Sequence, residues 1–406
     1  MRKEALDYHS NNGKPGKIGT KILTSVKNKE DLALAYTPGV AVPCLEIAKD
    51  KNKVYNYTSK GNSVAVISNG TAVLGLGNIG AAAGKPVMEG KALLFKHFAG
   101  IDAVDVEIDS EDVSEIVRTV ELISGTYGGI NLEDFKAPEC FDIEEKLKTK
   151  LSIPVFHDDQ HGTAVVVGAG LTNALKIIGK KFDKIKVVIN GAGSAGIAIG
   201  KMLLNLGVEK DSLFMCDSKG LIVAGNDYDV SKMIFARDED FKDLVEVIKG
   251  ADVFIGVSAA DVFSPDMLKD MNENPIVFAM ANPNPEISWD LAKATRDDIL
   301  MATGRSDFPN QVNNVLAFPG IFRGALDCRA SEINEEMKVA AVGALAGLIE
   351  EPTKDEFIVD AFNERIVIEI AFAVAGAAIK SGVCNKEFDL ISYKGKLEKE
   401  FLKDKN

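Results

Sequence analysis

Two pairs of adjacent carboxylates are the residues of this chain best suited to chemistry. Glu133 and Asp134 follow residues 130–132, which have the pattern of a strand, and Asp158 and Asp159 precede an apolar helical segment. Open α/β sheets bind their ligands at the carboxyl ends of strands. Paired carboxylates in apolar surroundings cost free energy unless a positive group lies beside them. The sequence therefore predicts a positively charged partner for Asp158 and Asp159.

A hard divalent cation would suit three of these four carboxylates. Glu133, Asp134 and Asp159 can supply oxygen ligands without a cysteine. Such a donor set favours magnesium or manganese over zinc. Asp158 then remains free to hold a base.

Four further side chains could take part in proton transfer or ligand binding. Lys91 stands in the first turn of a helix expected over residues 88–98, where the helix dipole would lower its pKa. Tyr36 ends a helical pattern that a Thr-Pro-Gly turn terminates. His157 and His161 could ligate a softer metal, but carboxylates are available, so we expect structural or hydrogen-bonding roles for them.

A dinucleotide site is indicated after residue 186. A buried strand over 186–190 runs into a G-x-G-x-x-G loop, a helix over 197–206, and a second strand that ends in Asp217. Glycines let the backbone approach a pyrophosphate, the helix amino terminus balances its charge, and the acid accepts from ribose hydroxyls. Asp217 favours NAD, although Ser218 and Lys219 could accept the extra phosphate of NADP. The residues expected to contact the cofactor are Gly191, Gly193, Ser194, Ala195, Gly196, Asp217, Ser258 and Asn282.

An earlier G-x-G-x-x-G at residues 75–80 is not expected to bind a dinucleotide. Pro86 would interrupt its crossover helix almost at once, so the loop is a cradle for a small anion at best. Just before it, residues 63–67 and 72–76 flank Asn69-Gly70, which predicts a β-hairpin.

Strand and helix patterns alternate along most of the chain, as expected of an α/β protein. Further strands are expected over 251–258 and 275–280, and long helices over 331–349 and 364–379. We predict an amino-terminal α/β substrate and metal domain over residues 1–160. Residues 161–406 would form a Rossmann-type domain with a doubly wound parallel sheet and the carboxyl-terminal helices.

Composition excludes several classes of function. The formal net charge of −13 and the lack of a basic stripe argue against nucleic-acid binding. No apolar stretch resembles a signal peptide or a membrane span. Five widely spaced cysteines without a Cys-x-x-Cys motif predict neither a zinc site nor a disulfide framework, and so a reduced, cytoplasmic protein.

The motifs resemble those of malic enzymes, and the chain is similar to the small bacterial type of that family. The resemblance covers residues 15–380 in family order. It rests on residues 35–40, 75–80, 87–92, 130–134, 155–163, 191–196, 282–283 and 313–320.

The resemblance implies oxidative decarboxylation of L-malate to pyruvate and carbon dioxide with NAD or NADP and Mg²⁺ or Mn²⁺. Lys91 would be the general base, Asp158 would hold it, and Tyr36 would protonate the enol carbon. The metal ligands would be Glu133, Asp134 and Asp159, and the substrate carboxylates would meet Asn282, Asn313 and Asn314. A homodimer is also implied, in which the amino-terminal segment could cross and place Tyr36 or Lys91 in the partner's site.

Two alternatives remain open from the sequence. Another Rossmann dehydrogenase acting on a small acid, such as an amino-acid dehydrogenase, would also use a lysine but would need no set of three carboxylates. A non-catalytic dinucleotide sensor would use Asp217 and the glycines alone.

One departure from the larger family members is Thr71-Ala72, where those members carry an arginine for the substrate carboxylate. Substrate binding would therefore rely on backbone amides, the metal and the asparagines.

Overall fold

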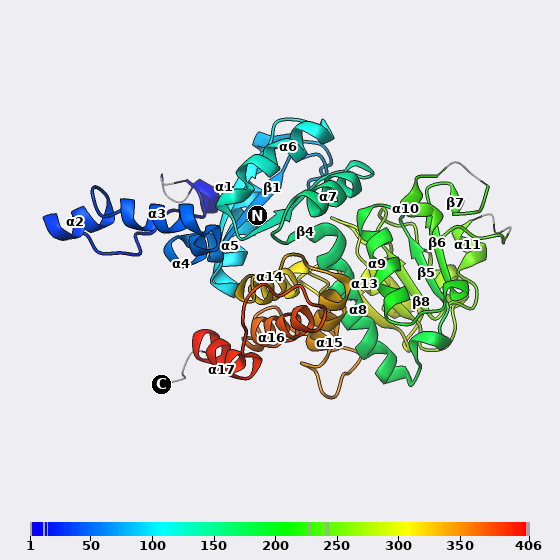
Figure 1. Cartoon of the computed structure of the whole chain (residues 1–406). Coiled ribbons are helices and arrows are strands. Elements are labelled where there is room, and N and C mark those ends of the chain that lie inside the picture. The colour runs from blue at the N-terminus through cyan, green and yellow to red at the C-terminus, as the bar shows by residue number, and fades with distance from the viewer. Residues whose placement is uncertain are drawn as a thin grey trace.

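The computed structural model describes residues 2–402 apart from 11, 12, 14, 226, 227, 240 and 242. The chain forms two sheets of mainly parallel strands with helices between and around them (Figure 1). The first has the strand order β2-β1-β3-β4, and the second has the order β10-β9-β8-β5-β6-β7. The predicted α/β architecture with a Rossmann-type sheet is confirmed.

The four strands of the first sheet are all parallel. Every residue of β1 is buried, as expected of a central strand in a parallel sheet covered on both faces. The strands are β1 (Ser63–Ser68), β2 (Asp102–Glu107), β3 (Gly129–Leu132) and β4 (Val155–His157), joined by α5 (Ala81–Ala99), α6 (Val113–Ile123) and α7 (Glu139–Lys150).

The predicted hairpin around Asn69 is wrong. β1 pairs with β2 on one edge and with β3 on the other, so neither edge is free for residues 72–76. Within that segment Val73 makes only an isolated bridge to Gly77. Both partners of β1 are distant in sequence, and this long-range pairing outweighs the local turn signal.

The helix that carries Lys91 is longer than predicted. α5 begins at Ala81 and includes Pro86 near its amino-terminal end. Proline there removes one helical hydrogen bond, but its fixed φ suits a helix. Lys91 consequently lies in the middle of α5 and not in its first turn. The helix dipole therefore cannot be what sets its pKa.

The second sheet carries the dinucleotide motif in the expected order. β5 leads through the glycine loop into α9 (Ser194–Asn205), and β6 follows and ends at Asp217. Helices cover both faces, with α8 (Asp158–Ile178) packed on α9. The parallel strands are β5 (Val187–Asn190), β6 (Leu213–Asp217), β8 (Val253–Gly256), β9 (Ile276–Ala279) and β10 (Leu300–Thr303), and β7 (Gly220–Leu221) is antiparallel.

The carboxyl-terminal helices connect the two sheets. α14 (Phe318–Asp327) packs on α16 (Arg365–Lys380) and on α5, and α15 (Glu335–Ala346) packs on α8 and α16. Phe318 meets Phe95 of α5 edge to face, with ring centroids 4.6 Å apart. One apolar core thus contains side chains of both sheets.

An amino-terminal arm projects from this body. It holds α2 (Lys29–Ala35) and α3 (Ala41–Lys49), which extend away from the first sheet (Figure 1). Large apolar side chains along it are exposed: Ile22, Leu23, Val26, Leu32, Leu34, Tyr36, Val42 and Leu45. Among all the described residues, the arm included, no helix has the length and apolar character that a membrane span requires.

Candidate active site

Lys91 lies at the centre of a buried group of charges. Its Nζ is 2.5 Å from Asp158 Oδ2 and 2.9 Å from Glu133 Oε1. The three side chains come from α5, the start of α8 and the end of β3, and each is almost wholly buried. Nζ also lies 4.2 Å from the centroid of the Phe318 ring. The positive partner predicted for Asp158 is therefore Lys91.

The pKa of Lys91 is raised, contrary to the prediction from the helix dipole. Burial by itself lowers this pKa, but the negative charges of Asp158 and Glu133 and their hydrogen bonds outweigh burial. A lysine between two carboxylates holds its proton. It can act as a base only when this stabilisation of the ammonium is weakened, as it would be if Glu133 bound a cation.

Three carboxylates beside Lys91 form a site that suits a divalent cation. Glu133, Asp134 and Asp159 each offer an oxygen, and these oxygens lie within 4.8 Å of one another. The backbone N–H of Asp134, a residue with a φ of 56°, donates to Asp159 Oδ2 at 2.8 Å. Asp134 Oδ2 is buried without a hydrogen-bond partner among the described residues. This donor set fits Mg²⁺ or Mn²⁺, as the sequence predicts.

The electrostatics of these carboxylates also point to a missing positive charge. Burial raises the pKa of Glu133, of Asp134 and of Asp159, and repulsion from neighbouring carboxylates raises each pKa further, with Asp158 as the neighbour that acts on Asp159. Lys91 opposes this effect. One ammonium is therefore too little to keep the cluster fully ionised, and a bound cation would supply the remaining charge.

Two asparagine side chains lie next to these carboxylates. Asn131, two positions before Glu133 on β3, donates from Nδ2 to Glu133 Oε2 at 2.9 Å. This contact was not predicted from the sequence, although the two-residue spacing along a strand places both side chains on one face. The side chain of Asn314 lies close enough to Asp158 to lower the pKa of that carboxyl. It is thus the predicted substrate-binding asparagine that the structure brings to Lys91.

The other two predicted asparagines lie differently. Asn313 accepts from the backbone N–H of Val315 at 3.0 Å and so caps the short helix that begins at Asn314. Asn282 is exposed in the loop after β9 and precedes Pro283 through a cis peptide bond. A Cβ on Gly75 would approach the carbonyl oxygen of Asn282 to 2.7 Å. The earlier glycine loop therefore packs against this second-sheet loop.

His157 ends β4, and His161 lies in the first turn of α8. His161 Nε2 lies 2.8 Å from Glu144 Oε1, and its Nδ1 lies 3.2 Å from Lys338 Nζ. Burial lowers the pKa of both His157 and His161 to about 4. His157 Nδ1 is 3.8 Å from Asp159 Oδ2. His161 therefore has the hydrogen-bonding role expected from the sequence, whereas neither ring nitrogen of the buried His157 has a hydrogen-bond partner among the described residues.

Tyr36 is not part of this buried group. It caps the carboxyl end of α2 on the projecting arm, and its side chain is 69% exposed. The arm with α2 and α3 extends away from the body of the molecule (Figure 1), whereas Lys91 is buried within that body. Within a single chain, the predicted proton donor and the predicted base are thus separate.

The glycine loop after β5 has the shape that a pyrophosphate requires. Gly191 has a φ of +119°, and a Cβ on it would lie 2.4 Å from the carbonyl oxygen of Val257. A Cβ on Gly196 would lie 1.8 Å from the carbonyl oxygen of Gly191. Gly193 faces open space at the amino terminus of α9, where Ser194 and Ala195 begin the helix. That terminus can bind an anion.

The carboxylate of Asp217, at the end of β6, has two partners in the structure. Asp217 Oδ1 accepts from the Lys219 N–H at 2.8 Å, and Oδ2 lies 3.1 Å from Lys232 Nζ. Sequence analysis did not anticipate Lys232, which is distant in sequence. Ser258 is exposed and follows β8, and Asn282 follows the parallel neighbouring strand β9.

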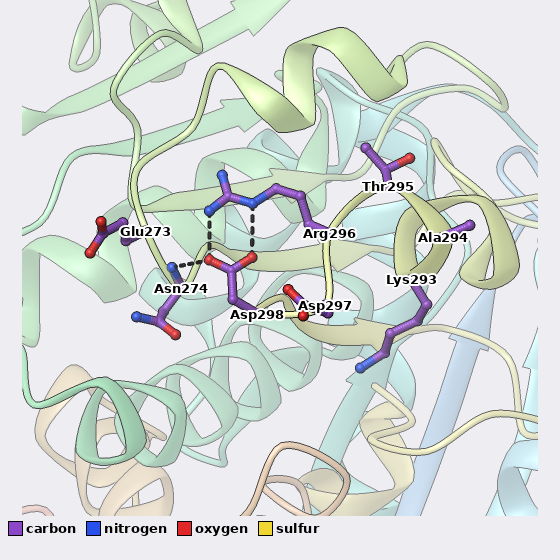
Figure 2. A pocket seen from close by; sticks show the side chains of 8 residues that line it. All are labelled: Glu273, Asn274, Lys293, Ala294, Thr295, Arg296, Asp297 and Asp298. Atoms are coloured by element: carbon purple, nitrogen blue, oxygen red, sulfur yellow. Dashed lines mark hydrogen bonds and ion pairs between the residues drawn. The ribbon is translucent and has the colours of Figure 1, made fainter.

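A separate surface hollow lies at the opposite end of the second sheet. It is lined by residues that precede β9 and β10, at the amino ends of these strands (Figure 2). Arg296 forms a two-point ion pair with Asp298, and Asp298 Oδ2 accepts from the Asn274 N–H at 2.8 Å. These charges satisfy one another, so the hollow is not a second candidate for the active site.

Known proteins match nearly all of the chain. Family models match residues 15–148 as "Malic enzyme, N-terminal domain" and residues 160–380 as "Malic enzyme, NAD binding domain". A bifunctional malic/malolactic enzyme of Bacillus subtilis is 55% identical, with 96% of each chain covered. A probable NADP-dependent malic enzyme of Rickettsia prowazekii is 52% identical over 97% of this chain but only 54% of its own length. The chain thus spans about half of some curated relatives and nearly all of others.

Solved structures agree with the sequence matches. A crystal structure of malic enzyme from Pyrococcus horikoshii has a TM-score of 0.91 at 44% identity, with 99% of this chain and 96% of that chain covered. Malic enzyme of Entamoeba histolytica has a TM-score of 0.93 at 36% identity. From the two family models and these near-complete matches it follows that the chain belongs to the malic enzyme family.

Proposed function

We propose that this protein catalyses the oxidative decarboxylation of L-malate to pyruvate and carbon dioxide, with reduction of NAD or NADP. The observation that carries the proposal is the position of Lys91. It lies between Asp158 and Glu133 and beside a three-carboxylate cation site. Neither an amino-acid dehydrogenase nor a dinucleotide sensor requires a lysine and a cation site that share a carboxylate.

Lys91 acts in this proposal as the base that accepts the hydroxyl proton of malate. Glu133 is both a partner of Lys91 and a candidate ligand. When Glu133 is engaged as a ligand, it stabilises the ammonium less, and the pKa of Lys91 falls toward the working range of a base. Asp158 keeps its contact with Nζ and orients it.

The cation and the cofactor supply the remaining chemistry. A Mg²⁺ or Mn²⁺ ion held by Glu133, Asp134 and Asp159 would supply Lewis acidity at the substrate oxygens, and the nicotinamide would accept the hydride. In this proposal Asn314 and Asn282 bind the substrate carboxylates through their amides. Asn313 caps the short helix that begins at Asn314 and so holds Asn314 in place. The glycine loop and Asp217 bind the dinucleotide. Because Lys232 forms an ion pair with Asp217, the site can accept either NAD or NADP.

We further propose that the protein works as a homodimer in the cytoplasm. Tyr36, the donor that protonates the enol carbon, lies on the exposed apolar arm and away from the Lys91 of its own chain. Exposed apolar surface of this extent is characteristic of a protein interface. In the dimer, the arm of one chain would bring Tyr36 to the Lys91 of the other.

The proposal is tested by incubating the protein with malate, Mn²⁺ and either NAD or NADP. We expect reduced cofactor, pyruvate and carbon dioxide to form in equal amounts. Cofactor reduction without carbon dioxide would indicate a different dehydrogenase. Cofactor binding without any turnover would indicate a sensor.

A further inference from the structure

A fully buried carboxylate joins two loops of the second sheet. Glu286 is 0% exposed and lies in the loop that follows β9. Its Oε1 accepts from the Ser258 N–H at 2.9 Å, and its Oε2 accepts from the Ala281 N–H at 3.0 Å. Ser258 follows β8, and Ala281 precedes Asn282. One side chain therefore fixes the two loops that carry Ser258 and Asn282.

The same hydrogen bonds continue to a third strand. Asn190, the last residue of β5, donates from Nδ2 to Ser258 Oγ at 2.8 Å. The network thus connects the carboxyl ends of β5, β8 and β9, which are neighbours in the sheet. In a sheet of this topology the ligand crevice lies outside these strand ends.

The charge of Glu286 is held by N–H groups and not by a cation. No described lysine, arginine or histidine forms an ion pair with it. Burial raises its pKa above the ordinary value, and the N–H groups of Ala281 and Ser258 oppose this rise without cancelling it. Both oxygens accept from N–H donors, an arrangement that favours the ionised carboxylate.

Gly256 at the end of β8 makes room for this carboxylate. A Cβ on Gly256 would lie 2.3 Å from Glu286 Cδ. The glycine therefore cannot be replaced without displacing Glu286 from the N–H groups. Sequence analysis had no signal for this pair, because the contact joins two different strand ends.

We propose that Glu286 is a positioning residue for the nicotinamide end of the cofactor site, and that its buried negative charge favours the oxidised cofactor over the reduced one. The ring is positively charged when oxidised and neutral when reduced, so a nearby anion in a poorly screened site stabilises only the oxidised form. The inference rests on the proposed function in taking the crevice beside Ser258 and Asn282 as the nicotinamide site.

The test compares dissociation constants of oxidised and reduced cofactor, measured by calorimetry on the full chain without malate. The cofactor pair is NAD⁺ and NADH, or NADP⁺ and NADPH if these bind more tightly. Glu286→Gln should weaken the oxidised form about tenfold more than the reduced form. Glu286→Asp, which keeps the charge, should leave the ratio of the two constants near that of the wild type. Glu273→Gln, at the opposite end of the sheet, is the control for loss of one negative charge.

Equal weakening of both forms by Glu286→Gln, or no weakening, would overturn the proposal. If that variant does not fold, Gly256→Ala is the second probe, since it displaces the intact carboxylate. Wild-type affinities for both forms in Gly256→Ala would also overturn it. A wild-type protein that binds cofactor but does not convert malate would contradict the proposed function alone.

Discussion

Glu133 links the lysine to the cation site. It contacts Lys91 Nζ at 2.9 Å and belongs to the three-carboxylate cluster. Ligand engagement by Glu133 and proton release by Lys91 are therefore coupled. From the sequence, Asp158 and Asp159 were predicted to need a positive partner, and Glu133 was predicted as a metal ligand. That one of them would serve both partners depends on three separate elements, and the sequence carries no sign of it.

Cation binding should depend on pH in a defined direction. Burial and repulsion from neighbouring carboxylates raise the pKa of Glu133, Asp134 and Asp159, so protons compete with the cation when the pH falls below these raised pKa values. We expect the rise in melting temperature caused by Mn²⁺ to be clearly larger at about pH 8 than at about pH 6. Thermal denaturation with and without Mn²⁺ measures this difference.

In the metal-free protein, the contribution of this carboxylate cluster to folding stability should decrease as the pH rises. The folded state keeps protons that the unfolded state has lost, so the cluster's contribution to stability falls as pH rises between the unfolded and folded pKa values. Asp134→Asn should flatten this trend and weaken the Mn²⁺ effect. An equal Mn²⁺ effect at both pH values would contradict the raised pKa values.

At the scale of elements, the glycine loop offers a matched pair of substitutions. Gly196→Ala places a methyl group against the carbonyl oxygen of Gly191 and should lower the free energy of unfolding by about 2 kcal/mol or more. Gly193→Ala enters open space and should leave stability near wild type, while it weakens cofactor binding by crowding the pyrophosphate. Chemical denaturation and cofactor titration separate the two effects. Equal stability losses would contradict the described loop.

Elements defined by local patterns were predictable, and those defined by distant contacts were not. Strand, glycine loop, helix and terminal Asp217 follow one another within one segment, and the structure has them in that order. The hairpin at Asn69 failed because β1 takes both of its partners from later in the chain. The helix-dipole argument for Lys91 failed because α5 starts before Pro86. The contact of Lys91 with Asp158 was expected and is present, whereas the contact with Glu133, directly after β3, was not expected.

At the scale of the whole molecule, the projecting amino-terminal arm is the feature that most requires a dimer. Tyr36 was identified in the sequence as a candidate proton donor, but its separation from Lys91 follows from the projecting arm. We expect the protein to elute as a dimer in size-exclusion chromatography. Removal of residues 1–40 should reduce dimerisation and abolish pyruvate formation while cofactor still binds.

Mixed dimers test whether Tyr36 acts across the interface. Tyr36→Phe and Lys91→Ala chains should each fail to form pyruvate on their own. If Tyr36 acts on the partner's Lys91, each mixed dimer has one intact site, so random mixing should restore about a quarter of wild-type activity. No recovery after confirmed subunit exchange would show that both residues act within one chain.

The most direct test of the account is the effect of Lys91→Ala on malate oxidation, with Lys85→Ala as the control on the same helix. Lys85 is about half exposed and forms ion pairs with Asp105 and Glu107, away from the cluster. We expect Lys91→Ala to lower kcat by about a thousandfold while the dissociation constant for the cofactor stays near wild type. Lys85→Ala should retain nearly full activity. A Lys91→Ala protein that oxidises malate within about tenfold of the wild-type rate would contradict the assignment of Lys91 as the base.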